Sequence, residues 1–210
     1  MASEEDQKAI HRVLVVLKAK GVIAEETVLK SMKTDWWLDF GADRITPVIY
    51  YNERYSSLEE SLLRFALSHE QYHLMNTKNW VRLSAAYAAC SVAAFLSMVE
   101  FLDILGLALI PVVLVLLWFV LLRMFGTALR TDETKADLHA ARTLIEKFET
   151  DKPSVVAMSL FKTLRETPRN RTALTYRVRR FFYTGLHPTD EERVRAIKSL
   201  EESTVRSSDR

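Results

Sequence analysis

The chain has 210 residues, which is enough for one ordinary domain with or without membrane spans. Its 29 basic and 27 acidic residues give a formal net charge of +2, so total charge points to no particular class of partner. One cysteine, Cys90, excludes an internal disulfide bond and a zinc site built from several thiolates.

The N-terminal segment carries no recognisable secretion signal. Acidic residues follow Met1, and the first apolar cluster, residues 13–17, is too short for the apolar part of a signal peptide. We therefore expect no secretion signal peptide. Residues 7–21, QKAIHRVLVVLKAKG, predict an amphipathic helix that ends at Gly21.

The stretch DWWLDFGADRITPVIYYN, residues 35–52, predicts a β-hairpin. Residues 36–40 and 45–51 have the composition of strands, and Gly41 lies between them. A free edge of this hairpin would suit pairing with an extended peptide. The alternative is a structural hairpin that only covers the core.

Residues 65–76, FALSHEQYHLMN, carry two histidines four positions apart. On a helix, His69 and His73 share one face, where both imidazoles can bind one metal ion. Glu70 lies beside that face, where it can take a proton from a hydrolytic water. SLEE at residues 57–60 has the pattern of a capping box that would start this helix. The alternative is a solvated helix that carries these residues by chance.

The run of residues 83–122 contains only two charged residues, Glu100 and Asp103. Residues 83–99 and 104–122 each approach the roughly 20 residues that a membrane-crossing helix needs. We predict a transmembrane helical hairpin, and the basic residues beyond both of its ends place these ends in the cytoplasm. The alternative is a buried helical hairpin of a soluble protein.

The helix predicted after this run carries Glu133 and Asp137, again four positions apart. Glu133 can supply the third protein ligand that a catalytic zinc ion needs besides two histidines. Asp137 can accept the N–H of a ligand histidine and fix its orientation. Ala136 and Ala140 are small enough to let this helix pack closely against the histidine helix. The alternative is an ordinary acidic helix face.

The C-terminal part contains a basic and aromatic stretch, residues 168–185. Next to a membrane hairpin it favours contact with anionic headgroups over nucleic acid, and a solvated packed helix is the alternative. Within LHPTDEERVRAI, residues 186–197, a capping box predicts that a helix begins after His187 and includes Arg193. Residues 203–210 predict a disordered tail.

The order of these motifs resembles that of HtpX-type membrane metallopeptidases and the related CAAX prenyl-protein proteases, which are gluzincins. The resemblance rests on H-E-x-x-H, an apolar hairpin, E-x-x-A-D and H-P-x-x-x-x-R, and it covers about residues 62–200. It implies one zinc ion per chain and a role for each of seven residues. These are the ligands His69, His73 and Glu133, the base Glu70, the supporting residue Asp137, and His187 and Arg193 as groups that bind substrate or stabilise the oxyanion.

The chain departs from the family pattern in three ways. Tyr72 stands where the family usually has glycine within H-E-x-x-H, which makes the helix bulkier near the metal. The N-terminal pair of membrane spans that HtpX-type members have is missing. The Asn-Ala pair of the substrate-binding edge strand is not evident either.

We therefore expect an α+β, mostly helical fold: a gluzincin-type metallopeptidase domain with an inserted two-helix transmembrane hairpin. Residues 1–82 and 123–202 would form one split domain, and residues 83–122 the hairpin. The expected protein is an integral membrane zinc endopeptidase of the cell membrane with a cytoplasmic catalytic domain. It would bind the bilayer and protein or peptide substrates, either membrane-associated or unfolded, and no nucleic acid. Homo-oligomer formation stays open.

The alternative is a non-proteolytic, metal-binding membrane adaptor or sensor with a vestigial peptidase fold. The intact Glu70 argues against it, because a structural metal site has no need of a base. An intramembrane protease of the site-2 type would need H-E-x-x-H inside an apolar span, whereas charged residues flank this motif. Prenyl-protein processing fits less well, since two spans enclose no large chamber unless several chains assemble.

Overall fold

The computed structural model describes residues 4–32, 39–43, 45–105, 109–166 and 188–208, and the fold is α+β and mostly helical, as predicted. The elements, in chain order, are α1 (Glu4–Ala19), β1 (Val28–Met32), β2 (Phe40–Asp43), β3 (Val48–Asn52), a 3₁₀ turn η1 (Glu53–Tyr55), α2 (Glu60–Met75), α3 (Thr77–Leu105), α4 (Leu109–Phe148), α5 (Pro153–Glu166) and α7 (Asp190–Ser208).

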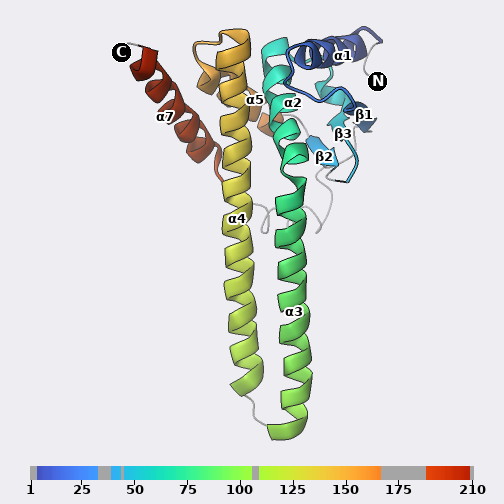
Figure 1. The fold of residues 1–210 in the computed structure, drawn as a ribbon, viewed down its shortest axis with the longest axis vertical. Helices are drawn as coiled ribbons and strands as arrows, with labels where there is room; N and C mark the ends of the chain where they lie inside the picture. The colour runs from blue at the N-terminus through green and yellow to red at the C-terminus, as the bar shows by residue number, and fades with distance from the viewer. Residues whose placement is uncertain (1–3, 33–38, 44, 106–108, 167–187, 209–210) are drawn as a thin grey trace.

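The long helices α3 and α4 project from a group of shorter elements at one end of the molecule (Figure 1). Within this group α2 lies beside the C-terminal half of α4. Helix α1 and strand β2 pack against α2, while α5 and α7 pack against each other and against α4. The pair α2 and α4 is therefore the centre of the fold.

The small sheet has the strand order β1-β3-β2, with β1 parallel and β2 antiparallel to β3. The predicted hairpin exists, but its turn is misplaced, because Gly41 lies inside β2 opposite Tyr50. The chain turns after Asp43, whose carboxylate accepts hydrogen bonds from the backbone of Ile45 and the hydroxyl of Thr46. A local side-chain acceptor thus sets the turn instead of a glycine. Residues 36–38 of the predicted first strand lie outside the described residues.

Gly21 closes α1 from the position just beyond its end, as predicted. Gly21 has a φ of +67°, a conformation that glycine adopts without a steric penalty. Its N–H donates to the carbonyl of Lys18, and the N–H of Val22 donates to that of Leu17, which is the pattern of a Schellman motif.

One of the two predicted capping boxes is wrong and the other is confirmed. Helix α2 begins at Glu60 after Glu59, without a side-chain hydrogen bond at its cap, so Ser57 does not cap it. At α7, the Thr189 hydroxyl accepts from the N–H of Glu192, and the Glu192 carboxylate accepts from the N–H of Thr189. This reciprocal pair fixes where α7 starts.

The described part of α7 continues through Ser208, contrary to the prediction of a disordered tail at residues 203–210. The sequence from Asp190 to Ser208 contains no glycine or proline that would end the helix. Ile197 is fully buried in the core and anchors α7 one turn and a half before this segment.

Residues from both sides of the run 83–122 build one core, as a split domain requires. Helices α2 and α4 contribute Leu63, Leu67 and Leu144, each at most 1 % exposed. Ala136 and Ala140 are fully buried, as expected if small residues let α4 approach its neighbours closely.

The described residues of the apolar run 83–122 lie within the helices α3 and α4, which run side by side (Figure 1). Tyr87 and Phe125 stack across the pair with ring centroids 4.8 Å apart. Within the described ranges, no helix is long and apolar enough to cross a membrane. The side chains of residues 97–115 lie outside the described part, and a transmembrane hairpin stays a prediction.

Replacement of Ala136 by leucine tests the importance of the α2–α4 packing. We expect Ala136→Leu to destabilise the protein by about 1–3 kcal/mol, because extra methylene groups in a tightly packed contact force the helices apart. Ala19→Leu, at an exposed position at the end of α1, is the matched control. Denaturant unfolding measures both variants, and equal stability would show that this contact is not tight.

Candidate metal centre

The three predicted metal ligands converge between α2 and α4. His69 and His73 come from α2 and lie on one face, and Glu133 comes from α4. The Nε2 atoms of the two histidines are 3.2 Å apart, and they lie 3.6 and 3.5 Å from the Glu133 carboxylate. One ligand atom from each residue fits within 4.8 Å of the others, so these residues can hold one metal ion.

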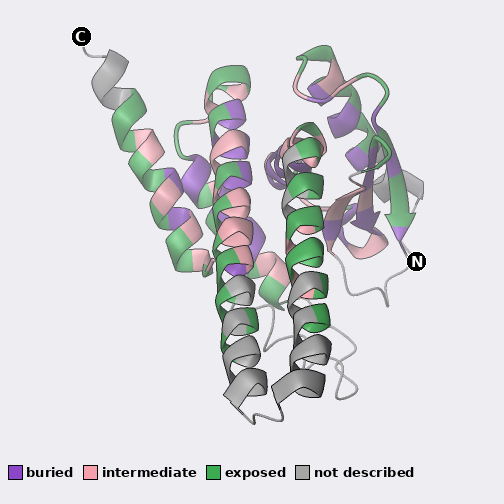
Figure 2. Ribbon diagram, turned by 60° about the horizontal axis from the view of Figure 1, so that its bottom comes forward, coloured by how far each residue is buried: buried purple, intermediate pink, exposed green. Residues whose placement is uncertain are grey.

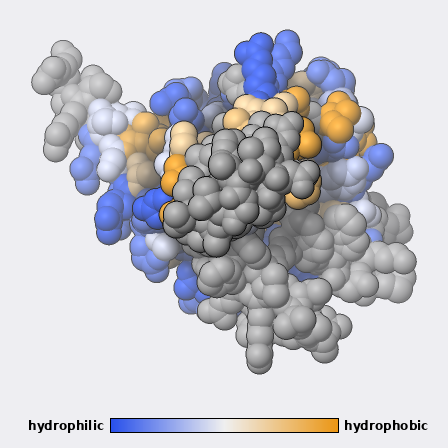
Figure 3. Space-filling view, turned by 90° about the horizontal axis from the view of Figure 1, so that it is seen from below, coloured by the Kyte–Doolittle hydropathy of each residue, from blue (hydrophilic) through white to orange (hydrophobic). Residues whose placement is uncertain are grey.

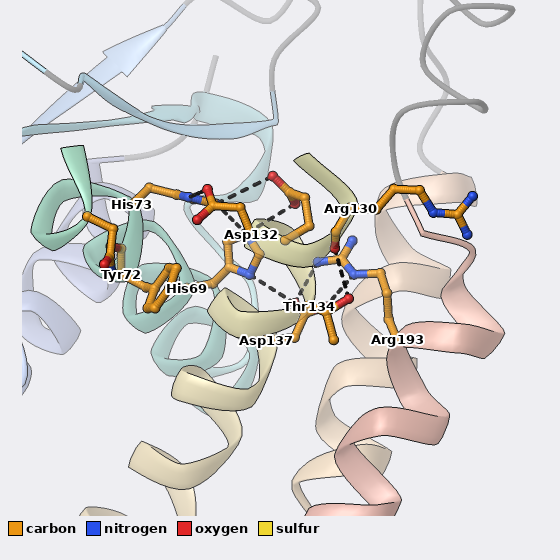
Figure 4. A network of polar contacts seen from close by, with 10 residues as sticks. His69, Tyr72, His73, Arg130, Asp132, Thr134, Asp137 and Arg193 are labelled. Carbon is orange, nitrogen blue, oxygen red and sulfur yellow. Dashed lines mark hydrogen bonds and ion pairs between the residues drawn. The ribbon is translucent and has the colours of Figure 1, made fainter. Parts of the chain in front are cut away.

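Each ligand histidine has a carboxylate on its other ring nitrogen (Figure 4). The Nδ1 atom of His69 is 2.9 Å from Asp137, and that of His73 is 3.2 Å from Asp132. Because an ionised carboxylate only accepts hydrogen bonds, Nδ1 carries the proton in both rings. In the neutral form of each ring the lone pair is then on Nε2, where it can bind a metal ion.

Asp137 is held from the opposite side by Arg193 of α7 (Figure 4). The guanidinium group donates to both carboxylate oxygens, at 2.5 and 2.6 Å, and it lies 4.1 Å above the ring of Phe161. Asp137 is fully buried, so this ion pair compensates for the loss of water around its charge. A chain of contacts thus runs from α7 through α4 to His69 on α2.

The electrostatics of this cluster favour a protonated His69 when no metal is bound. Burial alone lowers the pKa of His69, but the contacts with Asp137 and Glu133 outweigh burial and raise the pKa to about 10. Burial likewise lowers the pKa of His73, and its contacts with Asp132 and Glu133 raise it overall. Burial raises the pKa of Asp137, but its hydrogen bonds to Arg193 and His69 lower it overall.

Glu70 is 8 % exposed on α2, directly after His69. Its charge is among the influences that raise the pKa of His73, so the carboxylate acts on the same site.

Tyr72 sets its ring edge-on to His73 at a centroid distance of 5.9 Å, and His139 lies 5.8 Å from Tyr72. The tyrosine that replaces the usual glycine therefore packs beside a ligand instead of pointing away.

The remaining predicted residues have separate outcomes. Arg193 is placed against Asp137, and its contact with substrate or an oxyanion stays a prediction. His187 lies outside the described residues. The contact of Asp132 with His73 was not predicted, because helical spacing of four positions does not relate Asp132 to Glu133 or Asp137. The sequence feature that could have indicated it is the position of Asp132 directly before the third ligand.

The donor set suits zinc. Two imidazole nitrogens and one carboxylate oxygen form the His₂Glu set of catalytic zinc sites, which keep a fourth position for water or substrate. Carboxylates that orient the ligand histidines are a regular part of such sites. The residues therefore fit a zinc ion, with His69, His73 and Glu133 as its ligands.

Comparison with known proteins supports this assignment. The family model described as Peptidase family M48 matches residues 16–201, which is most of the chain and includes every residue of the site. Among the curated proteins and the solved structures, no significant match to the chain was found.

Zinc affinity should depend on pH in a way that the pKa of His69 determines. A histidine binds zinc only after it loses the competing proton, and the metal-free pKa of about 10 means that a proton must leave throughout the neutral range. We expect affinity to rise between about pH 7 and 9, by up to about tenfold per pH unit. Competition with a chelator, corrected for the chelator's own protonation, measures this.

A histidine with the ordinary pKa of 6.5 gives the opposite result at alkaline pH. Its proton is already lost at about pH 7.5, so zinc affinity would level off there. A plateau above about pH 7.5 would therefore contradict the electrostatic coupling of His69 to Asp137 and Glu133.

Proposed function

Because the chain belongs to peptidase family M48, a family of metallopeptidases, we propose that it is a zinc-dependent endopeptidase. Its substrates would be membrane-associated or unfolded proteins near the cytoplasmic membrane surface. The observation that carries the proposal is the convergence of His69 Nε2, His73 Nε2 and the Glu133 carboxylate beside Glu70. A purely structural metal site would have no need of that neighbouring carboxylate.

Each residue of the site has a different role in the proposed hydrolysis of the peptide bond. A zinc ion held by His69, His73 and Glu133 would supply Lewis-acid polarisation of the scissile carbonyl and of the attacking water. Glu70 takes a proton from that water and delivers it to the leaving amine. Asp137 and Arg193 keep His69 in the tautomer that presents Nε2. Direct contacts of His187 and Arg193 with the substrate would add to this arrangement.

An edge of the sheet suits a substrate in extended conformation. Strand β2 pairs on one side with β3, and it packs against α2, the helix that carries both histidines. An extended peptide that pairs with such an edge gains backbone hydrogen bonds and is held straight for attack. We therefore propose that the substrate lies along β2, which packs against the metal-binding helix.

Membrane anchoring through α3 and α4 is the second part of the proposal. Most of the described part of α3 is exposed, whereas α4 is largely buried or half-buried where it passes the other helices (Figure 2). Figure 3 looks at the molecule from below and shows apolar side chains gathered beside the grey atoms. Large apolar side chains in an exposed group mark contact with lipid or protein. Those on α3 and α4 include Val92, Phe95, Leu96, Leu116, Trp118, Val120 and Met124.

Replacement of Glu70 by glutamine should separate catalysis from metal binding. The amide keeps the size of the side chain but lacks the basic oxygen, so we expect about 10²–10⁴-fold slower cleavage of unfolded proteins with normal zinc content. Glu60→Gln, at an exposed position on the same helix, should leave the rate unchanged. Zinc analysis and peptide-release assays of the purified protein measure both effects.

Two ligand variants provide the comparison. His73→Ala and Glu133→Ala should lose most of the one zinc ion per chain, since each removes a ligand. Equal cleavage by wild type and Glu70→Gln would show that another residue is the base. A zinc-loaded wild type that cleaves none of a broad panel of peptides would instead favour the adaptor or sensor.

Membrane anchoring predicts a specific behaviour in cells. A protein that spans the bilayer stays in the membrane fraction after carbonate treatment, and we expect this of the full chain. Cysteines introduced at Glu100 or Asp103 should be labelled from the side opposite to cysteines at Lys78 or Arg130. Quantitative release by carbonate, or labelling of all four positions from one side, would contradict a spanning hairpin.

A further inference from the structure

We propose that Asp132 is a positioning residue that fixes His73 for metal binding, in parallel with Asp137 and His69. The inference deepens the proposed function, because it rests on a metal ion at His69, His73 and Glu133. The E-x-x-A-D motif includes Asp137 but not Asp132, so the motif alone does not assign this role.

The contact has the geometry of such a support. Oδ2 of Asp132 lies 3.2 Å from Nδ1 of His73, on the side of the ring opposite to the atom that faces Glu133. The described groups that could hold one metal ion comprise His69, His73 and Glu133 without Asp132. Asp132 therefore acts on the metal through His73 and not as a ligand.

Asp132 also precedes Glu133 directly in α4. Two consecutive residues of this helix thus have two roles: Glu133 is a metal ligand, and Asp132 holds the ligand His73. The helix therefore fixes the position of Asp132 relative to Glu133. The ring of Tyr72 packs against His73, so two contacts limit rotation of the imidazole.

The two supports differ in strength. Asp137 is fully buried, lies 2.9 Å from His69 and is locked by Arg193. The side chain of Asp132 is 23 % exposed and its distance to His73 is 3.2 Å. Water screens a partly exposed carboxylate, so Asp132 should contribute less to zinc affinity than Asp137 does.

Zinc affinity of the purified full-length protein tests the inference directly. Loss of a residue that orients a ligand typically weakens metal binding about 10–100-fold, and we expect a fall in this range for Asp132→Ala, measured by competition with a chelator. Asp132→Asn should fall less, because its amide oxygen still accepts the hydrogen bond. Asp151→Ala, at an exposed position outside the site, is the matched control and should bind zinc normally.

A second measurement keeps the inference testable if Asp132→Ala does not fold. Long-range ¹H–¹⁵N spectra of the zinc-loaded proteins should show the Nδ1 proton of His73 further downfield in the wild type than in Asp132→Asn, because a carboxylate accepts it more strongly than an amide does. Equal shifts would overturn the inference, and so would wild-type zinc affinity in Asp132→Ala. These results leave the proposed peptidase function standing, whereas a wild type that binds no zinc would overturn both proposals.

Discussion

The close contact between α2 and α4 is the constraint on which the rest of the structure depends. The three residues that can hold a metal ion are divided between these two helices, so their geometry depends on the separation that the helix packing imposes. Ala136 and Ala140 on α4 are fully buried and small, and Leu63 and Leu67 on α2 are fully buried in the core. Packing at interior density tolerates little displacement, which gives a three-residue metal site the rigidity that it needs.

An ion pair next to the metal-binding residues connects a third helix, α7, to the packing of α2 and α4. Arg193 pairs with the buried Asp137, which in turn holds His69, and so α7 is tied to the metal centre. An isolated carboxylate at that depth would be costly, whereas a paired and hydrogen-bonded one is tolerated. The capping box of Thr189 and Glu192 fixes the start of α7 and thereby the position of Arg193. Local helix chemistry far from the metal in sequence therefore helps to set the geometry of a ligand.

The site was largely predictable because helical spacing is a strong local rule. Two histidines four apart, and a glutamate and aspartate four apart, could each be assigned to one helix face from the sequence alone. Asp132 could not be found this way, because its contact with His73 depends on how two distant helices pack. The same limit applies to Arg193, whose partner Asp137 is 56 positions away.

The local errors have physical causes as well. Ser57 matches a capping pattern, but the helix begins later, at Glu60, and a short 3₁₀ turn ends just before Ser57. Gly41 suggested a turn, although the Asp43 carboxylate provides one by accepting local hydrogen bonds.

X-ray absorption at the zinc edge of the purified full-length protein tests the central claim most directly. The account predicts a four-coordinate zinc ion with two imidazole nitrogens and light oxygen donors at about 2.0–2.2 Å, as for a His₂Glu site that keeps one open position. Most of this zinc signal should be lost in His73→Ala, which lacks one of the two imidazoles. A spectrum with sulfur donors, or with six oxygen donors and no imidazole, would contradict a metal centre built by α2 and α4.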